Sequence, residues 1–309
     1  MAERPPVGAG AGAGGCVRRF VLERYPVRVI WTRLEQAWSE LRSYQHYPPA
    51  VEALLGEAVT ASVLLAATLK FEGTLSLQLQ GHGAVKLLVA QCTHDFQIRA
   101  AARVDSTVDR QAGFSEFVSD GQLAVTIEAN ERAARYQGIV ALQGDSLAAC
   151  LENYFATSEQ LPTRIALAAD GNCAAGVLLQ KMPPPSSQGE SLAAAAHQVW
   201  EDLQLNLSAL QAPPLCLGTA EEVLQRICGE HTGRLFASTP VRFVCRCSAE
   251  RVAGLLRALG SDEVHSVLAE QGAVTVTCEF CSRPYRFDAI DVERLFADGA
   301  GPGAPQSVN

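Results

Sequence analysis

The sequence has no long apolar run. Its most apolar stretch, Ala58 to Leu69, is 12 residues long and is interrupted by threonine and serine, whereas a membrane-spanning helix needs about 20 apolar residues. The first 20 residues are rich in glycine and alanine and lack the apolar core of a signal peptide. We therefore expect a buried helix at this stretch, no contact with membranes, and a cytoplasmic protein.

Positive charge is also scarce. The chain carries 25 lysines and arginines against 33 aspartates and glutamates, which gives a net charge of −8 and disfavours binding to nucleic acid or to anionic membranes. The phosphate-binding pattern GxxxxGK[ST] is missing as well. These absences argue against a nucleic-acid partner and against activity driven by a nucleotide.

The composition is that of a globular protein. Of the 309 residues, 48% are hydrophobic and 19% are charged, and the length suffices for two or three domains. Ten residues are cysteine. In a reducing compartment cysteines seldom form structural disulfides, so their number points to metal binding or redox chemistry.

The first domain is predicted to be α+β, over residues 18–182, because short turns join alternating strands with a few helices between them. Pro48 and Pro49 suit the first turn of a helix that runs to about Leu69, and Asp145 or Ser146 caps another. Residues 20–47 mix apolar and charged positions, and Leu34, Trp38 and Leu41 fall at helical spacing. Strands are predicted over 74–80, 85–91, 97–104, 122–129, 136–143, 163–169 and 173–180.

A linker follows. The stretch MPPPSSQGE, Met182 to Glu190, breaks every periodic pattern. The segment 183–240 then holds two helices with little apolar surface of their own, so we expect them to pack on a neighbouring part of the chain. The last module, 241–297, is predicted to contain two helices, a strand, a CEFC turn, a second strand and a final helix. Residues 1–17 and 298–309 are predicted to be flexible tails.

Four cysteines of the last module form two close pairs. Cys245 and Cys247 form a CxC, Cys278 and Cys281 form a CxxC, and thirty residues separate the pairs. Two thiol pairs brought together by the fold supply the four soft ligands of a tetrahedral zinc. We predict one structural zinc here. Zinc with four thiolates has a formal charge of −2, which nearby arginines would offset, namely Arg246, Arg283 and Arg286.

Other interpretations of the cysteines are weaker. A thioredoxin-like CxxC should start a helix, whereas Pro284 and the residues after it continue in extended form. A nucleic-acid zinc ribbon needs a basic face, but residues 241–297 hold seven arginines, no lysine and eight acidic residues. A catalytic zinc keeps one position open, and four thiolates fill the shell. We therefore expect no enzyme.

Several motifs occur together in an order that resembles one family, the redox-regulated heat-shock chaperones of about thirty-three kilodaltons. The resemblance covers nearly everything from Arg18 to Phe296. It rests on YPPAVEALLGEA at 47–58, LLAATLKFEGTLSLQLQGHG at 64–83, YQGIVALQGDSLAACLENYF at 136–155, SEQLPTRIALAAD at 158–170, the CxC, and VTCEFCSRPYRFDAIDVERLF at 276–296.

The resemblance implies an ATP-independent holdase that prevents aggregation under oxidative and heat stress. Reduced members of the family are inactive monomers with one zinc on four cysteines, here Cys245, Cys247, Cys278 and Cys281. The resemblance further implies that oxidation forms the disulfides Cys245–Cys247 and Cys278–Cys281, releases zinc, and unfolds the C-terminal module and the adjoining linker. The oxidised protein would then be a homodimer that holds unfolding client proteins.

The folding free energies of a zinc site and of two short disulfides differ enough to allow such a switch. A structural zinc contributes on the order of 10 to 16 kcal/mol of apparent folding free energy, whereas each short disulfide loop contributes roughly 2 kcal/mol before strain. A module of about 60 residues has little stability to lose. Oxidation is therefore expected to expel zinc and unfold the module.

Three points stay open on the sequence alone. The alternative function is a zinc-stabilised adaptor without redox switching. The client surface is expected around Leu192 to Ile227, where melting would uncover apolar residues. Most of the other cysteines are interpreted as small apolar residues, while Cys16, in the predicted tail, is expected to be exposed to mixed disulfides. The six are Cys16, Cys92, Cys150, Cys173, Cys216 and Cys228.

Overall fold

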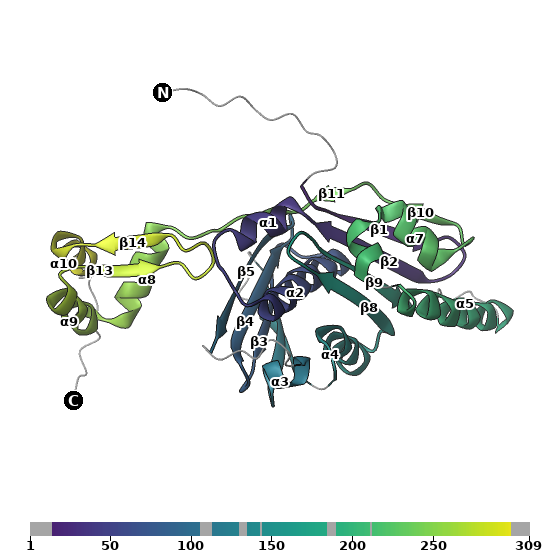
Figure 1. The fold of residues 1–309 in the computed structure, drawn as a ribbon, viewed down its shortest axis with the longest axis horizontal. Helices are drawn as coiled ribbons and strands as arrows, with labels where there is room; N and C mark the ends of the chain where they lie inside the picture. The colour runs from purple at the N-terminus through teal and green to yellow at the C-terminus, as the bar shows by residue number, and fades with distance from the viewer. Residues whose placement is uncertain are drawn as a thin grey trace, which may run out of the picture. The chain divides into compact units, whose positions relative to one another are not determined.

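The chain divides into two compact units. The computed structural model describes residues 14–105, 113–129, 135–142, 144–183, 190–210 and 212–297, and its units are Met1–Val244 and Cys245–Asn309 (Figure 1). The predicted α+β class is confirmed, as is a small C-terminal module with four cysteines. The border lies after Val244 rather than after Pro240 because Arg242 and Phe243 still pair with a strand of the first unit.

The first sheet of the first unit has the order β10-β1-β2-β9-β8, with β11 also beside β1, and all its pairs are antiparallel. Its strands are β1 Cys16–Leu22, β2 Val27–Leu34, β8 Thr163–Ala169, β9 Ala174–Lys181, β10 Gly233–Leu235 and β11 Thr239–Pro240. Strands far apart in sequence therefore share this sheet, and the predicted strands at 163–169 and 173–180 are confirmed.

The second sheet has the order β12-β5-β4-β3-β6-β7. Its strands are β3 Gly73–Gln80, β4 Val85–Thr93, β5 Gln97–Val104, β6 Gln122–Ala129, β7 Arg135–Ala141 and β12 Arg242–Phe243. Pairing is antiparallel except that β12 runs parallel to β5. The alternating leucines of β3 are fully buried, as strict alternation in a one-sided strand requires. The predicted strands at 74–80, 85–91, 97–104 and 122–129 are confirmed, and so is the one at 136–143 as far as Ala141.

Helix α2, Pro49–Thr68, is the core of the first unit. It packs against β2, β8 and β9 of the first sheet and β3, β4 and β5 of the second. By length and apolar composition alone it could cross a membrane, but 78% of that window is buried inside the protein, which agrees with the buried helix expected from the sequence. Contact with the first sheet is close at Gly56, where an added Cβ would lie 2.5 Å from the Cβ of Ala169.

Three further helices and a short π-helix complete the sheet-bearing part of the unit. They are α1 Gln36–Arg42, α3 Phe114–Val118, α4 Leu147–Tyr154 and the π-helix η1 Phe155–Glu159. The predicted cap of α4 is Ser146, whose hydroxyl accepts a hydrogen bond from the Ala149 amide.

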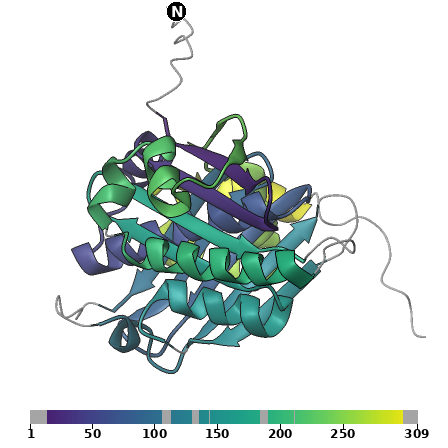
Figure 2. The same ribbon diagram turned by 90° about the vertical axis from the view of Figure 1, so that its right-hand side faces the viewer.

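The predicted helical linker packs on the first unit, as expected for helices with little apolar surface of their own. Helices α5 Glu190–Ser208, α6 Ala212–Leu217 and α7 Ala220–Cys228 lie over the first sheet (Figure 2), and their buried side chains join its core. Leu203 of α5 and Ile227 of α7 are fully buried there, together with Val29 and Val177 from the sheet. The apolar faces of these helices are satisfied by the sheet, which is why the segment belongs to the first unit. Residues 184–189 of the predicted linker lie outside the described residues.

The helical spacing within residues 20–47 is confirmed at Trp38 and Leu41, which lie in α1, whereas residues 20–22 and 27–34 belong to β1 and β2, which were not predicted. Arginines on the strands obscured the alternation. Arg19 Nε donates to the Ala67 carbonyl and Arg28 Nη1 to the Thr68 carbonyl, both at 2.9 Å. These arginines satisfy the last carbonyls of α2, where positive charge is favourable.

The predicted N-terminal tail was too long at its inner end. Cys16 lies in β1 between β2 and β11, is half-buried, and packs against the core of the first sheet. The exposure expected for Cys16 is therefore wrong, since strand pairing holds it. Residues 1–13 and 298–309 of the predicted tails lie outside the described residues.

The second unit is small. It comprises helices α8 Ala249–Leu259, α9 Ser261–Gln271 and α10 Ala289–Ala297 and the hairpin of β13 Val274–Thr277 and β14 Pro284–Phe287. The predicted caps Ser248 and Asp288 accept hydrogen bonds from the first-turn amides of α8 and α10, whereas α9 is preceded by Gly260, with Ser261 as its first residue. Among the residues that the structure describes, five buried side chains form its core cluster, with partly buried apolar side chains packed against them; the five are Leu256, Val264, Val274, Val292 and Leu295.

The half-buried Glu57 on α2 provides a pH test of this core. Burial raises the pKa of its carboxyl to about 7, so the folded protein holds the proton more tightly than the unfolded chain. Stability from this group is full below about pH 4.5 and is lost as the pH rises through 7. We predict that the stability of Glu57→Gln relative to the natural protein increases by about 1 to 2 kcal/mol from pH 5 to pH 8, after discounting for partial exposure. Denaturant unfolding at both pH values measures this; a difference that is the same at both would contradict it.

Candidate metal centre

Two separate segments of the second unit carry the four cysteines. Cys245 and Cys247 lie in the extended stretch that precedes α8, just before its cap Ser248. Cys278 and Cys281 lie in the turn between β13 and β14. The turn is held by two backbone hydrogen bonds of 2.9 Å, from Cys278 N to the Arg283 carbonyl and from Ser282 N to the Cys278 carbonyl. The fold thus presents two rigid thiol pairs to each other.

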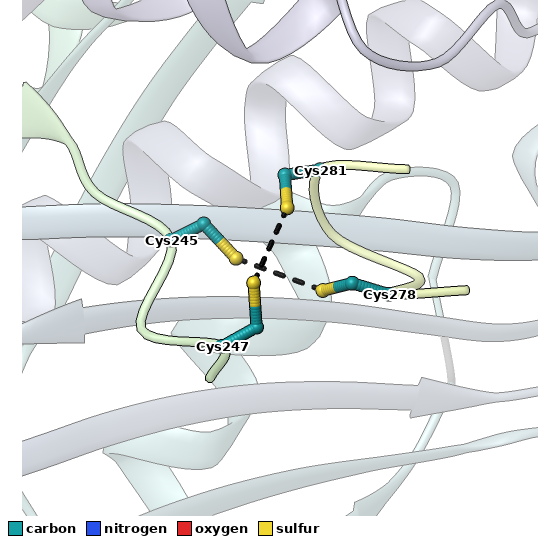
Figure 3. A group of neighbouring side chains, drawn as sticks. All are labelled: Cys245, Cys247, Cys278 and Cys281. Atoms are coloured by element: carbon teal, nitrogen blue, oxygen red, sulfur yellow. Dashed lines mark hydrogen bonds between the residues drawn. The ribbon is translucent and has the colours of Figure 1, made fainter. Parts of the chain in front are cut away.

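All four sulfur atoms meet at one point, as the sequence predicted. They lie within 4.8 Å of one another, and their side chains converge from the two segments (Figure 3). The distance from Cys245 Sγ to Cys278 Sγ is 3.6 Å, and from Cys247 Sγ to Cys281 Sγ it is 3.5 Å. The ligands of a tetrahedral zinc with bonds of about 2.3 Å are separated by about 3.8 Å. A disulfide would need about 2.0 Å, and all four thiols are free.

The surroundings favour the thiolate at one position. Burial tends to raise the pKa of Cys247, but hydrogen bonds from Tyr285 and from the other three cysteines outweigh it and lower the pKa to about 7. Burial raises the pKa of Cys245 to about 12 and also raises that of Cys281. A bound cation would deprotonate all four, since a coordinating thiol loses its proton.

Tyr285 is a site residue that the sequence analysis missed. Its hydroxyl donates a hydrogen bond to Cys247 Sγ at 3.0 Å, which places it directly outside the four sulfurs, where such partners orient metal ligands. The available signal was its position on β14, the strand that follows the CxxC. Of the predicted arginines, Arg283 interacts with Tyr285 and then with the charges of Cys247 and Cys281, and these interactions raise its pKa. Charge compensation by Arg246 and Arg286 remains a prediction.

The other six cysteines lie elsewhere. Cys92, Cys150, Cys173, Cys216 and Cys228 are buried in the first unit, as expected for small apolar side chains, and Cys16 lies in β1. The four-sulfur set fits a soft divalent cation such as zinc, because thiolates are its preferred ligands and four of them close the shell. The centre therefore has the chemistry of a structural clamp rather than of a catalytic metal site.

Comparison with known proteins gives one consistent family. The family model described as Hsp33 protein matches residues 16–288. A 33 kDa chaperonin of Pseudomonas paraeruginosa is 42% identical over 293 residues, which covers 94% of this chain and 97% of the relative. A 33 kDa chaperonin of Shewanella sediminis is 40% identical over 290 residues, with coverage of 94% and 98%.

A solved structure shares the fold. The crystal structure of the 33 kDa chaperonin (heat shock protein 33 homolog) from Thermotoga maritima matches with a TM-score of 0.78 and covers 92% of this chain and 98% of its own. Its sequence identity is 22%, so this match concerns the arrangement of the chain.

The centre predicts metal binding in a defined ratio. We expect the reduced protein to hold one zinc per chain, and Cys281→Ser to weaken the site at least tenfold because one of four thiolate ligands is lost. Cys228→Ser removes a buried thiol outside the centre and serves as the control, with zinc retained. Elemental analysis after dialysis against a weak chelator measures both; full zinc in Cys281→Ser would show that the four thiols do not form one site.

Proposed function

Because the chain belongs to the Hsp33 protein family, we propose that it is a redox-regulated, ATP-independent chaperone of the cytoplasm that holds unfolding client proteins and prevents their aggregation. The observation that carries the proposal is the meeting of four thiols from two segments in a unit with a very small core. The names of the relatives support a chaperone role, and the cysteine centre supports control by oxidants. We expect no catalytic activity of its own.

In the reduced state Cys245, Cys247, Cys278 and Cys281 would hold one zinc ion. When bound, the ion supplies a tetrahedral cross-link and no reaction chemistry. Such a site contributes on the order of 10 to 16 kcal/mol of apparent folding free energy. Five buried apolar side chains give a unit of this size little stability of their own, so the cross-link would be the largest contribution to the folding free energy of the unit.

Oxidation would remove the cross-link chemically. A peroxide takes two electrons from each thiol pair and is reduced to water, and the proposed products are the disulfides Cys245–Cys247 and Cys278–Cys281. Two of the present sulfur contacts, Cys245 to Cys278 and Cys247 to Cys281, run between the segments. Disulfides within each pair replace these contacts and no longer join the CxC segment to the hairpin. The second unit would then unfold.

Unfolding would spread to the helices that cover the first sheet. The chain that leads into Cys245 pairs with the sheets through short strands, since β10 has three residues and β11 and β12 have two each. Their loss would leave α5, α6 and α7 attached by side-chain packing. Release of these helices uncovers an apolar surface that includes Val199, Leu203, Val223 and Ile227. We propose this surface for clients and for pairing of two oxidised chains, while the reduced protein is a monomer. Leu192, in the range expected from the sequence, lies in α5.

Aggregation of a client protein tests the switch. We predict that zinc-loaded reduced protein leaves light scattering of a heat-denatured client unchanged, and that peroxide-treated protein suppresses it. Protein oxidised and then returned to dithiothreitol and zinc is the control for irreversible damage. Equal suppression in both states, or none in either, would instead favour a zinc-stabilised adaptor without redox switching.

Packing of α5 on the first sheet opposes the release of this helix after oxidation. Leu203 is 0% exposed and Leu205, on the same helix, is 68% exposed. Leu203→Ala should weaken helix docking by about 2 to 5 kcal/mol, so the oxidised variant should suppress aggregation at a lower temperature than the natural protein. Leu205→Ala is the matched control and should behave as the natural protein. Identical temperature profiles for all three would contradict a role for α5 release.

A further inference from the structure

Two buried cysteines outside the metal centre are in contact. Cys173 ends the turn between β8 and β9, and Cys216 lies in α6. The Cys173 thiol donates a hydrogen bond to the Cys216 carbonyl at 3.6 Å, and both side chains belong to the core of the first sheet. Helix α6 packs on β8 and β9, so the pair joins the edge of the sheet to one of the covering helices.

Both positions are fixed by hydrogen bonds. The Asp170 carboxylate accepts hydrogen bonds from the amides of Asn172 and Cys173, at 2.7 and 2.9 Å, and these bonds shape the turn. At the other side, Arg33 Nη1 donates to the carbonyls of Leu217 and Gly218, at 3.3 and 2.9 Å. The C-terminal end of α6 is thereby tied to β2, and the two cysteines are held in register.

We propose that Cys173 and Cys216 are a second oxidation site, at which a peroxide forms a disulfide that fastens α6 to the first sheet. One thiol of the pair, as its thiolate, attacks the peroxide, the O–O bond breaks, and a sulfenic acid and one water result. The sulfur of the other cysteine then attacks the sulfenic sulfur, which forms the S–S bond and releases a second water. Two thiols lose two electrons and two protons, and one hydrogen peroxide becomes two waters.

The contact between the two cysteines separates their acidities. It raises the pKa of Cys173 and lowers the pKa of Cys216. The thiolate is the nucleophile, so this difference favours Cys216 as the thiol that reacts first. Cys228, buried in the same core, lacks this feature, because its pKa is raised by burial alone.

The disulfide would act against the metal centre. Oxidation of the four zinc-site cysteines favours release of α5, α6 and α7, whereas a Cys173–Cys216 disulfide holds α6 on β8 and β9. This consequence rests on the proposed function, but the existence of the disulfide does not. Strong oxidation would then yield a chain in which the second unit unfolds while α6 stays docked.

Peptide mapping tests the disulfide directly. Trypsin leaves Cys173 and Cys216 each as the single cysteine of its own peptide, 165–181 and 182–226. Full-length zinc-loaded protein is treated with hydrogen peroxide, blocked with N-ethylmaleimide and digested without reductant. We expect the two peptides joined within one chain, with a mass two hydrogens below their sum, and their separation by reductant. If both cysteines carry N-ethylmaleimide while the zinc-site cysteines are oxidised, the proposal is overturned; the zinc-site peptides report on the proposed function separately.

Hydrogen exchange tests the consequence. In peroxide-treated protein, amides of α6 should exchange at least tenfold more slowly in the natural chain than in Cys173→Ser. Cys228→Ser, which removes another buried thiol of the same core, is the matched control and should exchange as the natural chain does. Equal exchange in all three proteins, or equal acceleration in both variants, would show that the disulfide does not hold α6.

Discussion

The convergence of four sulfur atoms is the interaction on which the second unit depends. Its hairpin and three helices bury a cluster of only five apolar side chains, and the CxC stretch and the CxxC turn meet through their sulfurs within 4.8 Å. A metal clamp of this kind contributes more folding free energy than such a core can. Because the ligands of the proposed clamp would be thiolates, the link that we propose to hold the unit together would also be the one that oxidants attack.

The first unit holds the apolar surface that the proposed switch would expose. Helices α5, α6 and α7 cover the first sheet with side chains as deeply buried as those of the sheet itself. The strands that follow them, β10, β11 and β12, have two or three residues each. The chain therefore runs from this large apolar contact to Cys245 through short strands. In the proposed switch, this order along the chain would couple an event at the cysteines to the exposure of apolar surface.

The sequence was sufficient for features that local chemistry determines. Alternation identified β3, serine caps identified α4 and α8, and the CxC and CxxC pairs identified the centre before any geometry was known. It was insufficient where distant residues decide. Arg19 in β1 and Arg28 in β2 occupy strand positions because they donate hydrogen bonds to the last carbonyls of α2. The docking of helices α5, α6 and α7 depends on a sheet assembled from four parts of the chain. Tyr285 was missed because its role follows only from its 3.0 Å contact with Cys247.

The most direct test follows three quantities during one peroxide titration of the reduced, zinc-loaded protein: zinc released, thiols lost from the four zinc-site cysteines, and far-UV circular dichroism. The account predicts that zinc and these four thiols are lost together and that helical signal falls in the same step, because the clamp holds the second unit folded. Loss of all four thiols and of zinc with an unchanged spectrum would contradict it.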